Sequence, residues 1–303
     1  MYDYRVLFKR VIIPTLNNDF VPFPIQKSIC TGWASSNIRY GGDTILYTGC
    51  MYQIAYLSSR LAEILEKLPE NFIYNALNLT PFLKLYKPPK AELDRAYNIL
   101  RNISNSLKRN GIDFGYLYED EPYSGALLLE AGFYDEFSTY AKKVTLKLRE
   151  KGVKKIITVD PHSLNAFERY REFINNFDIE IYSYLDLIKD VGGKVRITDE
   201  FVVHDSCLYS KFLNRREKYR DLAKKEGIRI VDDWMVTSLE NSLCCGAPLE
   251  VVNPQISRKI AEVRLKQLKK VSKNILVACP FCYANLSKVN DKEVKIKDIA
   301  EYL

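Results

Sequence analysis

The chain has 303 residues, a length that favours two domains, and its 47% hydrophobic and 27% charged residues are typical of a folded rather than a disordered protein. No apolar run is long enough to predict a transmembrane segment, and Arg5, Lys9 and Arg10 interrupt the N-terminal apolar pairs where a signal peptide would be continuous. We therefore expect a cytoplasmic protein, with peripheral attachment to a membrane through a complex left open.

The net charge of +7 raises the question of nucleic acid, but no nucleic-acid-binding motif accompanies the basic residues. We expect no nucleic acid partner. The basic residues between Lys142 and Lys155 are expected to form a solvated helix face. The alternative is a docking surface for an acidic electron-transfer partner, which electrostatic steering would favour.

Residues 1–44 form an N-terminal extension without a clear pattern. Two apolar triplets, at 6–8 and 11–13, predict short strands, and Pro14 would break a helix that continued through them. A regular alternation of strands and helices begins only at Ile45.

The stretch from Ile45 onward alternates between apolar runs and amphipathic segments. The apolar runs predict strands at 45–48, 114–117, 156–159 and 179–182. Apolar residues spaced three and four apart predict helices over 54–68, 93–107, about 130–151, and around 185–188. The proline-containing stretch 69–90 is expected to be irregular.

Gly192-Gly193 marks the boundary that we expect between two domains, at 1–192 and 193–303, because the order of elements begins again after it. The second domain has predicted strands and helices of the same kinds. Its strands are expected at 201–203, 228–231 and 275–277, and its helices up to Gly227 and over about 254–272.

The two halves align with one another. Gly125 and Pro161 are 36 residues apart, and Gly246 and Pro280 are 34 residues apart. Cys50 aligns with a cysteine at position 207, and each follows a predicted strand. We therefore predict an α/β fold of two tandem pseudo-symmetric repeats, each a mostly parallel sheet flanked by helices.

Five of the seven cysteines gather in the second repeat, at Cys207, Cys244, Cys245, Cys279 and Cys282. Ligands in such folds collect at the carboxyl ends of strands, where the first and fourth of these cysteines are expected. Clustered cysteines in a cytoplasmic chain favour metal binding or redox chemistry over disulfides, and adjacent cysteines bond each other poorly. The sequence therefore predicts a metal or cluster site in residues 193–303.

The spacing favours an iron–sulfur cluster over zinc. A zinc site commonly takes two Cys-x-x-Cys pairs, and here only Cys279 and Cys282 form one. Adjacent Cys244 and Cys245 reach the several irons of a cluster more readily than one small ion. Gly246 allows a close backbone approach from which amides can donate to sulfide. Zinc remains the alternative.

The pattern Cys207, Cys244-Cys245-Gly246 and Cys279-Pro280-Phe281-Cys282 resembles the CCG domain, the cysteine-rich repeat of the B-type and D-type chains of heterodisulfide reductase and of related iron–sulfur oxidoreductases. The segment from His204 to Cys207 is similar to that around the family's first cysteine. Residues 45–50 and 121–125 resemble the same segments of a first repeat. The likeness extends over roughly residues 44–300.

This resemblance implies one noncubane [4Fe-4S] cluster held by the five cysteines of the second repeat. It implies partners as well: the ferredoxin-like component and the flavoprotein component of a heterodisulfide reductase-like complex, and a sulfur-bearing substrate or carrier protein. The first repeat departs from the family pattern, since its remaining ligand positions hold Tyr123, Ser124, Asp160 and Ser163. A single cluster fits better with the heterodisulfide reductase-like complexes of sulfur oxidisers, which carry two B-type chains.

Residues around these positions have weaker predicted roles. His204 is a candidate proton donor or hydrogen-bond donor to the cluster, with a backbone-bonded histidine as the alternative. Cys50 is expected to be a relic or a small buried hydrophobe, and Cys30 to be structural. A small metal site of Asp160, Cys50 and His162 has little support from spacing. Tyr123 is expected to fill the volume of the missing cluster.

Three functions compete. The first is a redox component, like the B-type chain of heterodisulfide reductase, that transfers electrons to or from a disulfide or thiol substrate. The second is a zinc-stabilised interaction module. The third is the cysteine-rich component of an archaeal succinate dehydrogenase or of an anaerobic glycerol-3-phosphate dehydrogenase. Metal content and the flavoprotein that co-purifies would separate them.

Overall fold

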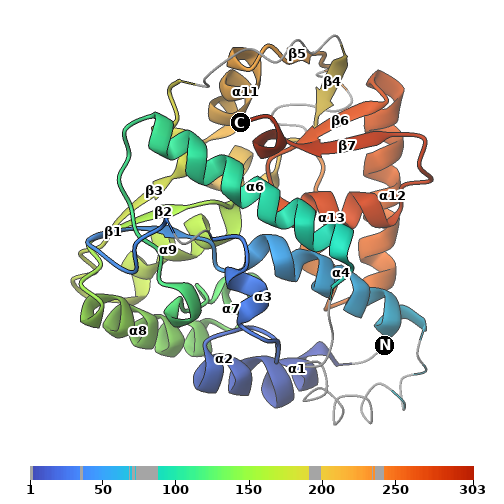
Figure 1. Ribbon diagram of the computed structural model, residues 1–303. Helices are drawn as coiled ribbons and strands as arrows, with labels where there is room; N and C mark the ends of the chain where they lie inside the picture. Colours follow the sequence, from blue (N-terminus) through green and yellow to red (C-terminus); the bar gives the residue numbers. More distant parts are fainter. Residues whose placement is uncertain are drawn as a thin grey trace.

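The computed structural model describes residues 3–34, 37–67, 69, 72, 88–190, 199–233, 235 and 242–303. The expected irregular stretch 69–90 falls mostly outside these residues. The predicted boundary at Gly192-Gly193 falls outside them entirely. The described chain contains two parallel sheets with helices packed around them (Figure 1).

Each half of the described chain contains one sheet. The first is β1-β2-β3, formed by Thr44–Tyr47, Lys155–Thr158 and Glu180–Ser183. The second is β5-β4-β6-β7, formed by Arg229–Ile230, Glu200–Val203, Asn274–Val277 and Lys295–Asp298. Every pairing is parallel, so the carboxyl ends of β1 and β2, and of β4 and β6, meet at one edge of each sheet.

The strand predicted at 114–117 is reduced to two isolated parallel bridges, Tyr40 with Tyr116 and Ile45 with Gly115. These bridges lie beside β1, in the place that β5 takes beside β4. Gly115 explains the close approach, because a Cβ there would lie 1.7 Å from the carbonyl oxygen of Gly41. With this segment counted, each half repeats the same parallel arrangement, and the predicted α/β fold class is confirmed.

The longer helices follow the predicted order. One more helix, α9, lies between β2 and β3, where no helix was predicted. The longer ones are α4 (Met51–Lys67), α6 (Lys90–Arg109), α8 (Tyr134–Glu150), α9 (Pro161–Phe173), α11 (Arg216–Lys225), α12 (Pro254–Val271) and α13 (Pro280–Lys288). Shorter ones are α7 (Ala126–Glu130), α10 (Tyr184–Leu187), the π-helix η4 (Leu208–Phe212) and the 3-10 helices η3 (Tyr118–Asp120), η6 (Ala247–Leu249) and η7 (Ile299–Glu301).

The predicted strands in the N-terminal extension are wrong. Residues 4–19 form a continuous helical segment of α1 (Tyr4–Leu7), the π-helix η1 (Phe8–Ile12) and α2 (Ile13–Asp19), and α3 (Ser28–Thr31) follows. The apolar triplets are one buried helix face, since Leu7, Phe8, Val11 and Ile12 are all buried. Pro14 stands directly after the π-helical turn, at the start of α2, where the hydrogen-bonding pattern changes from that of a π-helix to that of an α-helix.

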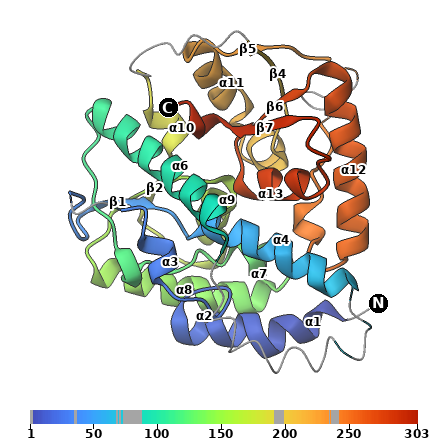
Figure 2. The same ribbon diagram turned by 45° about the vertical axis from the view of Figure 1, so that its right-hand side comes forward.

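The two repeats meet through equivalent helices. In one contact α4, which follows Cys50, packs on α13, and Figure 2 shows these two helices side by side. In the other contact η4, which follows Cys207, packs on α9. Helix α6 also crosses to the second repeat, where the Asn102 side chain donates to the carbonyl of Ala300 over 2.9 Å. None of the helices in the described part of the chain is both long and apolar enough to cross a bilayer.

Candidate metal centre

The candidate centre lies at the carboxyl ends of β4 and β6, where the parallel sheet brings two loops together. Val203 at the end of β4 pairs with Leu276 of β6, so the segments that follow them leave the sheet side by side. Cys207 follows β4, and Cys279 is the N-cap of α13 directly after β6. Cys282 lies in the first turn of α13. The turn with Cys244 and Cys245 completes the group.

The five thiols form a chain of contacts. Hydrogen bonds link Cys207 with Cys244, Cys244 with Cys245, Cys245 with Cys282, and Cys282 with Cys279. Hydrogen bonding from Cys207 and Cys245 lowers the pKa of Cys244 to about 2, and the Gly246 N–H, 3.3 Å from its sulfur, adds to the effect. These contacts favour the thiolate, the form in which cysteine binds metal, at Cys244, whereas they raise the pKa of Cys207, Cys245 and Cys282.

Gly246 sets the shape of the turn. Its φ is +89°, and a Cβ would lie 2.7 Å from the carbonyl oxygen of Ser257, a backbone atom of α12 that cannot move aside. The Asn285 side chain of α13 donates to the carbonyl of Cys245 over 2.7 Å and to the Ser257 hydroxyl over 3.2 Å. The two adjacent cysteines are thus fixed from α12 and from α13.

His204 is held as a neutral donor beside the thiols. Its Nδ1 accepts from the Arg264 Nε over 3.1 Å, so the proton is on Nε2, since arginine only donates. Burial and the Arg264 charge lower the pKa of His204 to about 3. Nε2 is buried without a hydrogen-bond partner, and ligand atoms of His204, Cys245 and Cys282 lie within 4.8 Å of one another.

An unpaired buried N–H beside thiols is costly unless a further acceptor occupies the site. Sulfide of an iron–sulfur cluster is such an acceptor, and the five thiols supply the ligands that irons take. The residues present therefore fit a cluster. The neutral state of His204 suits hydrogen-bond donation, and its role as a proton donor stays a prediction.

The loop before Cys207 rests on a buried ion pair. Asp205 and Arg220 form a two-point contact, with distances of 2.9 and 2.7 Å, and the Tyr219 hydroxyl also donates to Asp205. Arg220 continues to Asp232 over 2.7 Å. The Ser242 hydroxyl donates to the Asp205 carbonyl over 3.0 Å, which ties the two cysteine-bearing loops together.

His162 reaches the centre from the first repeat. Its Nε2 lies 3.3 Å from the Cys279 sulfur, and its Nδ1 lies 2.7 Å from a Glu130 carboxylate oxygen. Burial raises the pKa of Cys279, but hydrogen bonding from Cys282 and the charge and contact of His162 lower it to about 5. The sequence placed His162 only in the lost site. His162 aligns with Phe281 of the second repeat, and the centroids of the two rings lie 4.8 Å apart.

The first repeat keeps the geometry of the site without its thiols. Gly125 has a φ of +79° where Gly246 has +89°, and each is the N-cap of the next helix. Asp160 caps α9 as Cys279 caps α13, and its carboxylate accepts from the N–H groups of His162 and Ser163, each over 2.9 Å. Tyr123 is buried, as expected for a side chain that fills the vacated volume.

The predicted roles of Cys30 and Cys50 need correction. The structure joins them in a disulfide, so Cys50 is neither a relic nor a free small hydrophobe, and it is not available to a site with Asp160 and His162. Cys30 has the structural role of forming this bond. The other five cysteines are all free of disulfides.

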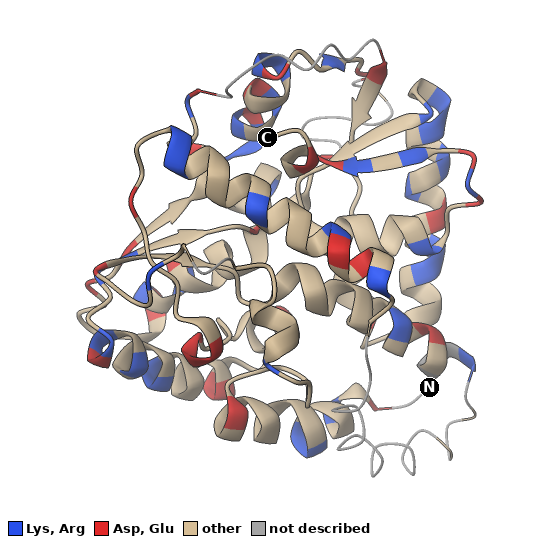
Figure 3. Ribbon diagram, viewed as in Figure 1, with Lys and Arg blue, Asp and Glu red and all other residues tan. Residues whose placement is uncertain are grey.

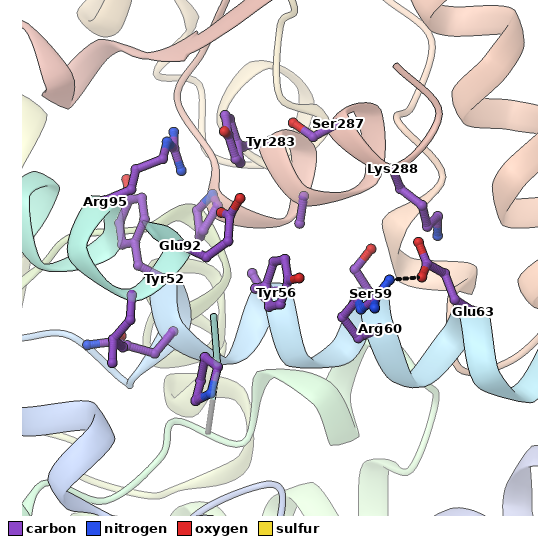
Figure 4. Close-up of a pocket in the computed structure, with 16 residues that line it drawn as sticks. Tyr52, Tyr56, Ser59, Arg60, Glu63, Glu92, Arg95, Tyr283, Ser287 and Lys288 are labelled. Carbon is purple, nitrogen blue, oxygen red and sulfur yellow. Dashed lines mark hydrogen bonds and ion pairs between the residues drawn. The ribbon is translucent and has the colours of Figure 1, made fainter. Parts of the chain in front are cut away.

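A separate pocket of about 260 Å³ lies between α4, α6 and α13 (Figure 4). Its walls carry tyrosines and charged side chains, among them Tyr52, Arg95, Tyr283 and Lys288. The three cations of its wall already have partners: Arg95 pairs with Glu301 over 2.7 Å, Lys288 with Glu250 over 3.0 Å, and Arg60 with Glu63 over 2.5 Å. None of the five cysteines lines this pocket, which is a feature of the contact between the repeats.

Residues 201–287 match the family described as the cysteine-rich CCG domain. This part of the chain is a CCG domain. The match runs from β4 into α13 and includes all five clustered cysteines. The predicted likeness to CCG-domain iron–sulfur proteins is thereby confirmed, with a first repeat that lies outside the match.

Two curated relatives agree with this assignment. The chain is 27% identical over 226 residues to the probable iron-sulfur-binding oxidoreductase FadF of Bacillus subtilis (strain 168). It is 27% identical over 232 residues to EtfAB:quinone oxidoreductase of Syntrophomonas wolfei subsp. wolfei (strain DSM 2245B / Goettingen). Each match covers 69% of this chain but 32% of the relative, so the chain spans about a third of the length of these proteins.

Among solved structures, glutamate racemase from Aquifex pyrophilus is 18% identical, with a TM-score of 0.31 over 68% of this chain and 76% of that one. A likeness at this level has no bearing on fold or activity. The CCG match and the two relatives therefore support an iron–sulfur oxidoreductase-like protein for which electron transfer is plausible.

Proposed function

We propose that this chain is a redox component that binds one noncubane [4Fe-4S] cluster through Cys207, Cys244, Cys245, Cys279 and Cys282. The observation that carries the proposal is the convergence of these five thiols beside the unpaired Nε2–H of His204. A bound cluster would accept and release single electrons. In this proposal the chain acts as the B-type component of a heterodisulfide reductase-like complex.

The chain's own residues would hold and tune the cluster. The Gly246 N–H donates to the Cys244 sulfur, and the unpaired His204 Nε2–H would be available to cluster sulfide. Hydrogen bonds to cluster sulfur raise the reduction potential. His162 contacts Cys279 from the first repeat and is fixed by Glu130. The second repeat thus supplies the ligands, and the first repeat supplies one wall of the site.

Metal analysis tests this proposal. Protein purified without oxygen is expected to contain about four irons and about four acid-labile sulfides per chain and to give an electron paramagnetic resonance signal on oxidation or reduction. Cys245→Ser should lose most of the iron, whereas Cys50→Ser, outside the five, should retain it. Protein that holds one zinc and no iron would instead establish the zinc-stabilised interaction module.

The partners are proposed from the same chemistry. A ferredoxin-like component and a flavoprotein component, with a second B-type chain, would connect the cluster to other redox centres, and a disulfide or thiol sulfur would be the substrate. Exposed Lys142 and Lys143 on α8 offer a basic surface for an acidic partner (Figure 3). Binding of such a partner should weaken steeply as the salt concentration rises.

A second candidate is electron delivery toward a quinone, which the name of the Syntrophomonas relative favours. Stopped-flow mixing separates the two. Chemically reduced protein is mixed with a small disulfide in one arm and with a water-soluble quinone in the other, and reoxidation of the cluster is followed by its absorbance. Co-purification with a flavoprotein that oxidises succinate or glycerol-3-phosphate would favour the dehydrogenase alternatives.

A further inference from the structure

The first repeat has a disulfide where the second repeat has a candidate ligand. Cys50 follows β1 as Cys207 follows β4, and it is bonded to Cys30 of α3. Cys50 has a left-handed backbone, with a φ of +58°, directly after Gly49 at +54°. A non-glycine residue in this region stores backbone strain and persists only where its surroundings hold it.

The surroundings of Cys50 do hold it. The Glu121 carboxylate, which is buried, accepts from the N–H groups of Thr48 and Gly49 over 2.9 and 2.8 Å and from the Thr48 hydroxyl over 2.7 Å. The turn that presents Cys50 is thus fixed by three hydrogen bonds. None of them depends on the disulfide.

The other side of the disulfide is equally independent of it. The Cys30 carbonyl accepts from the Gln53 amide over 3.1 Å and from the Tyr116 hydroxyl over 3.4 Å. Tyr97 donates to the carbonyl of Ile29 over 2.8 Å, and Arg101 holds α3 from its other end through the carbonyl of Trp33 over 3.0 Å. The two cysteines would therefore stay in place after the S–S bond is broken, because α3 is also held by these hydrogen bonds and not by the disulfide alone.

A small cavity of about 20 Å³ borders both cysteines. Phe20, Lys27, Tyr118 and Glu119 form its rim and are partly or fully exposed, so the cavity communicates with the surface. Lys27 donates from Nζ to the carbonyl of Glu119 over 3.0 Å and places an ammonium group at the opening. A positive charge there attracts an approaching thiolate.

We propose that Cys30 and Cys50 form a redox-active dithiol–disulfide couple, which exchanges with small anionic thiols that approach the rim of this cavity beside Lys27. An incoming thiolate attacks one sulfur, forms a mixed disulfide and releases the other cysteine as a thiolate, which takes a proton. A second thiol then displaces the first as a small-molecule disulfide. In sum, two small thiols are oxidised to one disulfide while the protein disulfide gains two electrons and two protons.

The couple lies near the start of α9. A Cβ on Gly49, next to Cys50, would be 2.9 Å from the Ser163 hydroxyl, and Ser163 follows the histidine that contacts Cys279. The first repeat thus retains a sulfur-based redox site at the end of β1. This inference is independent of the proposed cluster, since the exchange uses residues of the first repeat alone.

Thiol trapping tests the couple. The folded protein is equilibrated with mixtures of reduced and oxidised dithiothreitol, alkylated with N-ethylmaleimide, and digested, and the peptides of Cys30 and Cys50 are measured by mass spectrometry. We expect both cysteines to be reduced together and to re-form the disulfide when the mixture is made more oxidising, so that their alkylated fractions rise and fall together, while the circular dichroism spectrum of the folded protein is unchanged. Reduction only after denaturant is added, or failure of the reduced cysteines to re-form the disulfide before alkylation, would overturn the proposal.

The entry route has its own test. Lys27→Met should slow reduction by anionic 3-mercaptopropionate about threefold to tenfold relative to cationic cysteamine, because it removes the attracting charge at the rim. Lys154→Met, which removes an exposed lysine elsewhere on the first repeat, should leave the ratio of the two rates unchanged. Equal rates for both thiols in wild-type protein and in Lys27→Met would exclude access past Lys27.

Discussion

The two repeats stabilise the same loop by different chemistry. In the second repeat, the loop between β4 and Cys207 is held by Asp205, whose buried carboxylate pairs with Arg220. In the first repeat, the aligned position is Thr48, and the buried carboxylate comes instead from Glu121 on the opposite loop. Ser242, which aligns with Glu121, reaches Asp205 by a hydroxyl. The buried carboxylate thus lies on a different loop in each repeat, but in both repeats a hydrogen bond joins the two loops.

This comparison distinguishes the backbone features that both repeats share from the side chains in which they differ. The features that both repeats share are backbone features: parallel strand order, a left-handed glycine at Gly125 and Gly246, and an N-cap at Asp160 and Cys279 followed by proline. The features that differ are the side chains that a cluster would need. A repeat can therefore lose its ligands without losing its fold, because the geometry does not depend on them.

The largest effect should follow from breaking the ion pair that only the second repeat has. Arg220→Met leaves the Asp205 carboxylate fully buried with the Tyr219 hydroxyl but without its cation, which should cost about 3–5 kcal/mol of stability. Iron content should fall as well, because Asp205 is two residues before Cys207. Chemical denaturation and iron analysis measure the two effects.

Two variants control this prediction. Lys218→Met changes an exposed cation on the same helix α11 and should alter the free energy of unfolding by less than about 0.5 kcal/mol. Thr48→Val removes the hydroxyl donor at the aligned position of the first repeat and should cost only about 1 kcal/mol. If Arg220→Met were as mild as Thr48→Val, the two repeats would not differ in the way described.

The left-handed glycines provide a second contrast. Gly246→Ala places a Cβ 2.7 Å from the backbone oxygen of Ser257 and should destabilise the protein by about 2–4 kcal/mol, with loss of iron. Gly125→Ala meets the side chain of Tyr140 at 3.0 Å, which can shift, and should cost about 1–2 kcal/mol with iron retained.

Gly152→Ala is the matched control for these two variants. Gly152 has a φ of +73°, and a Cβ there would have no neighbour within 4 Å, so this variant measures the conformational cost alone, about 1 kcal/mol. Thermal unfolding of the three variants should therefore rank Gly246→Ala below Gly125→Ala and Gly125→Ala below Gly152→Ala. Equal melting temperatures would show that the close contact at Ser257 has no consequence.

Glu121 should give the first repeat a pH dependence that Ser242 cannot give the second. Burial raises the pKa of Glu121 from 4.5 to about 8, against hydrogen bonds from Thr48 and Gly49 that lower it. The folded protein then binds a proton that the unfolded chain has lost, so this contribution to stability is complete below pH 4.5 and disappears as the pH rises to about 8. The slope is at most about 1.4 kcal/mol per pH unit.

Glu121→Gln should reduce this slope, measured as the free energy of unfolding at several pH values between 5 and 8. Asp160 and Asp298 retain slopes of the same sign, because burial raises their pKa values to about 6 and about 7. The slope should therefore decrease without vanishing. An unchanged slope in the variant would mean that Glu121 is ionised in the folded protein throughout this range.

The sequence was sufficient for the parallel strands because each is a short apolar run between charged helices. The predicted strands at 45–48, 156–159, 201–203 and 275–277 lie within a residue or two of β1, β2, β4 and β6. It was insufficient for β7, whose alternating Lys295, Ile296 and Lys297 mark an edge strand. It was also insufficient for the extension, where an apolar triplet fits a helix face as well as a strand.

Part of the candidate site could likewise be predicted from the sequence, and part of it could not. The five cysteines could be grouped from their spacing, because the loops that carry them follow adjacent parallel strands. The disulfide could not, since cysteine pairing is not fixed by sequence alone. The contact of His162 with Cys279 could not either, because it depends on how one repeat packs on the other, and a repeat in sequence does not specify that packing.

The smallest expected effect concerns the shared N-cap. Asp160→Ala removes the acceptor for the N–H groups of His162 and Ser163 at the start of α9 and should cost about 1 kcal/mol, measured by chemical denaturation. Asp160→Asn keeps one carbonyl oxygen as an acceptor and should restore most of this loss. Cys279 stands at the aligned N-cap of α13, where its sulfur contacts the thiol and the backbone N–H of Cys282 in place of a carboxylate cap. If Asp160→Ala were as stable as wild type, the Asp160 carboxylate would not stabilise the start of α9. The first repeat would then tolerate any small residue at the position where the second repeat has Cys279.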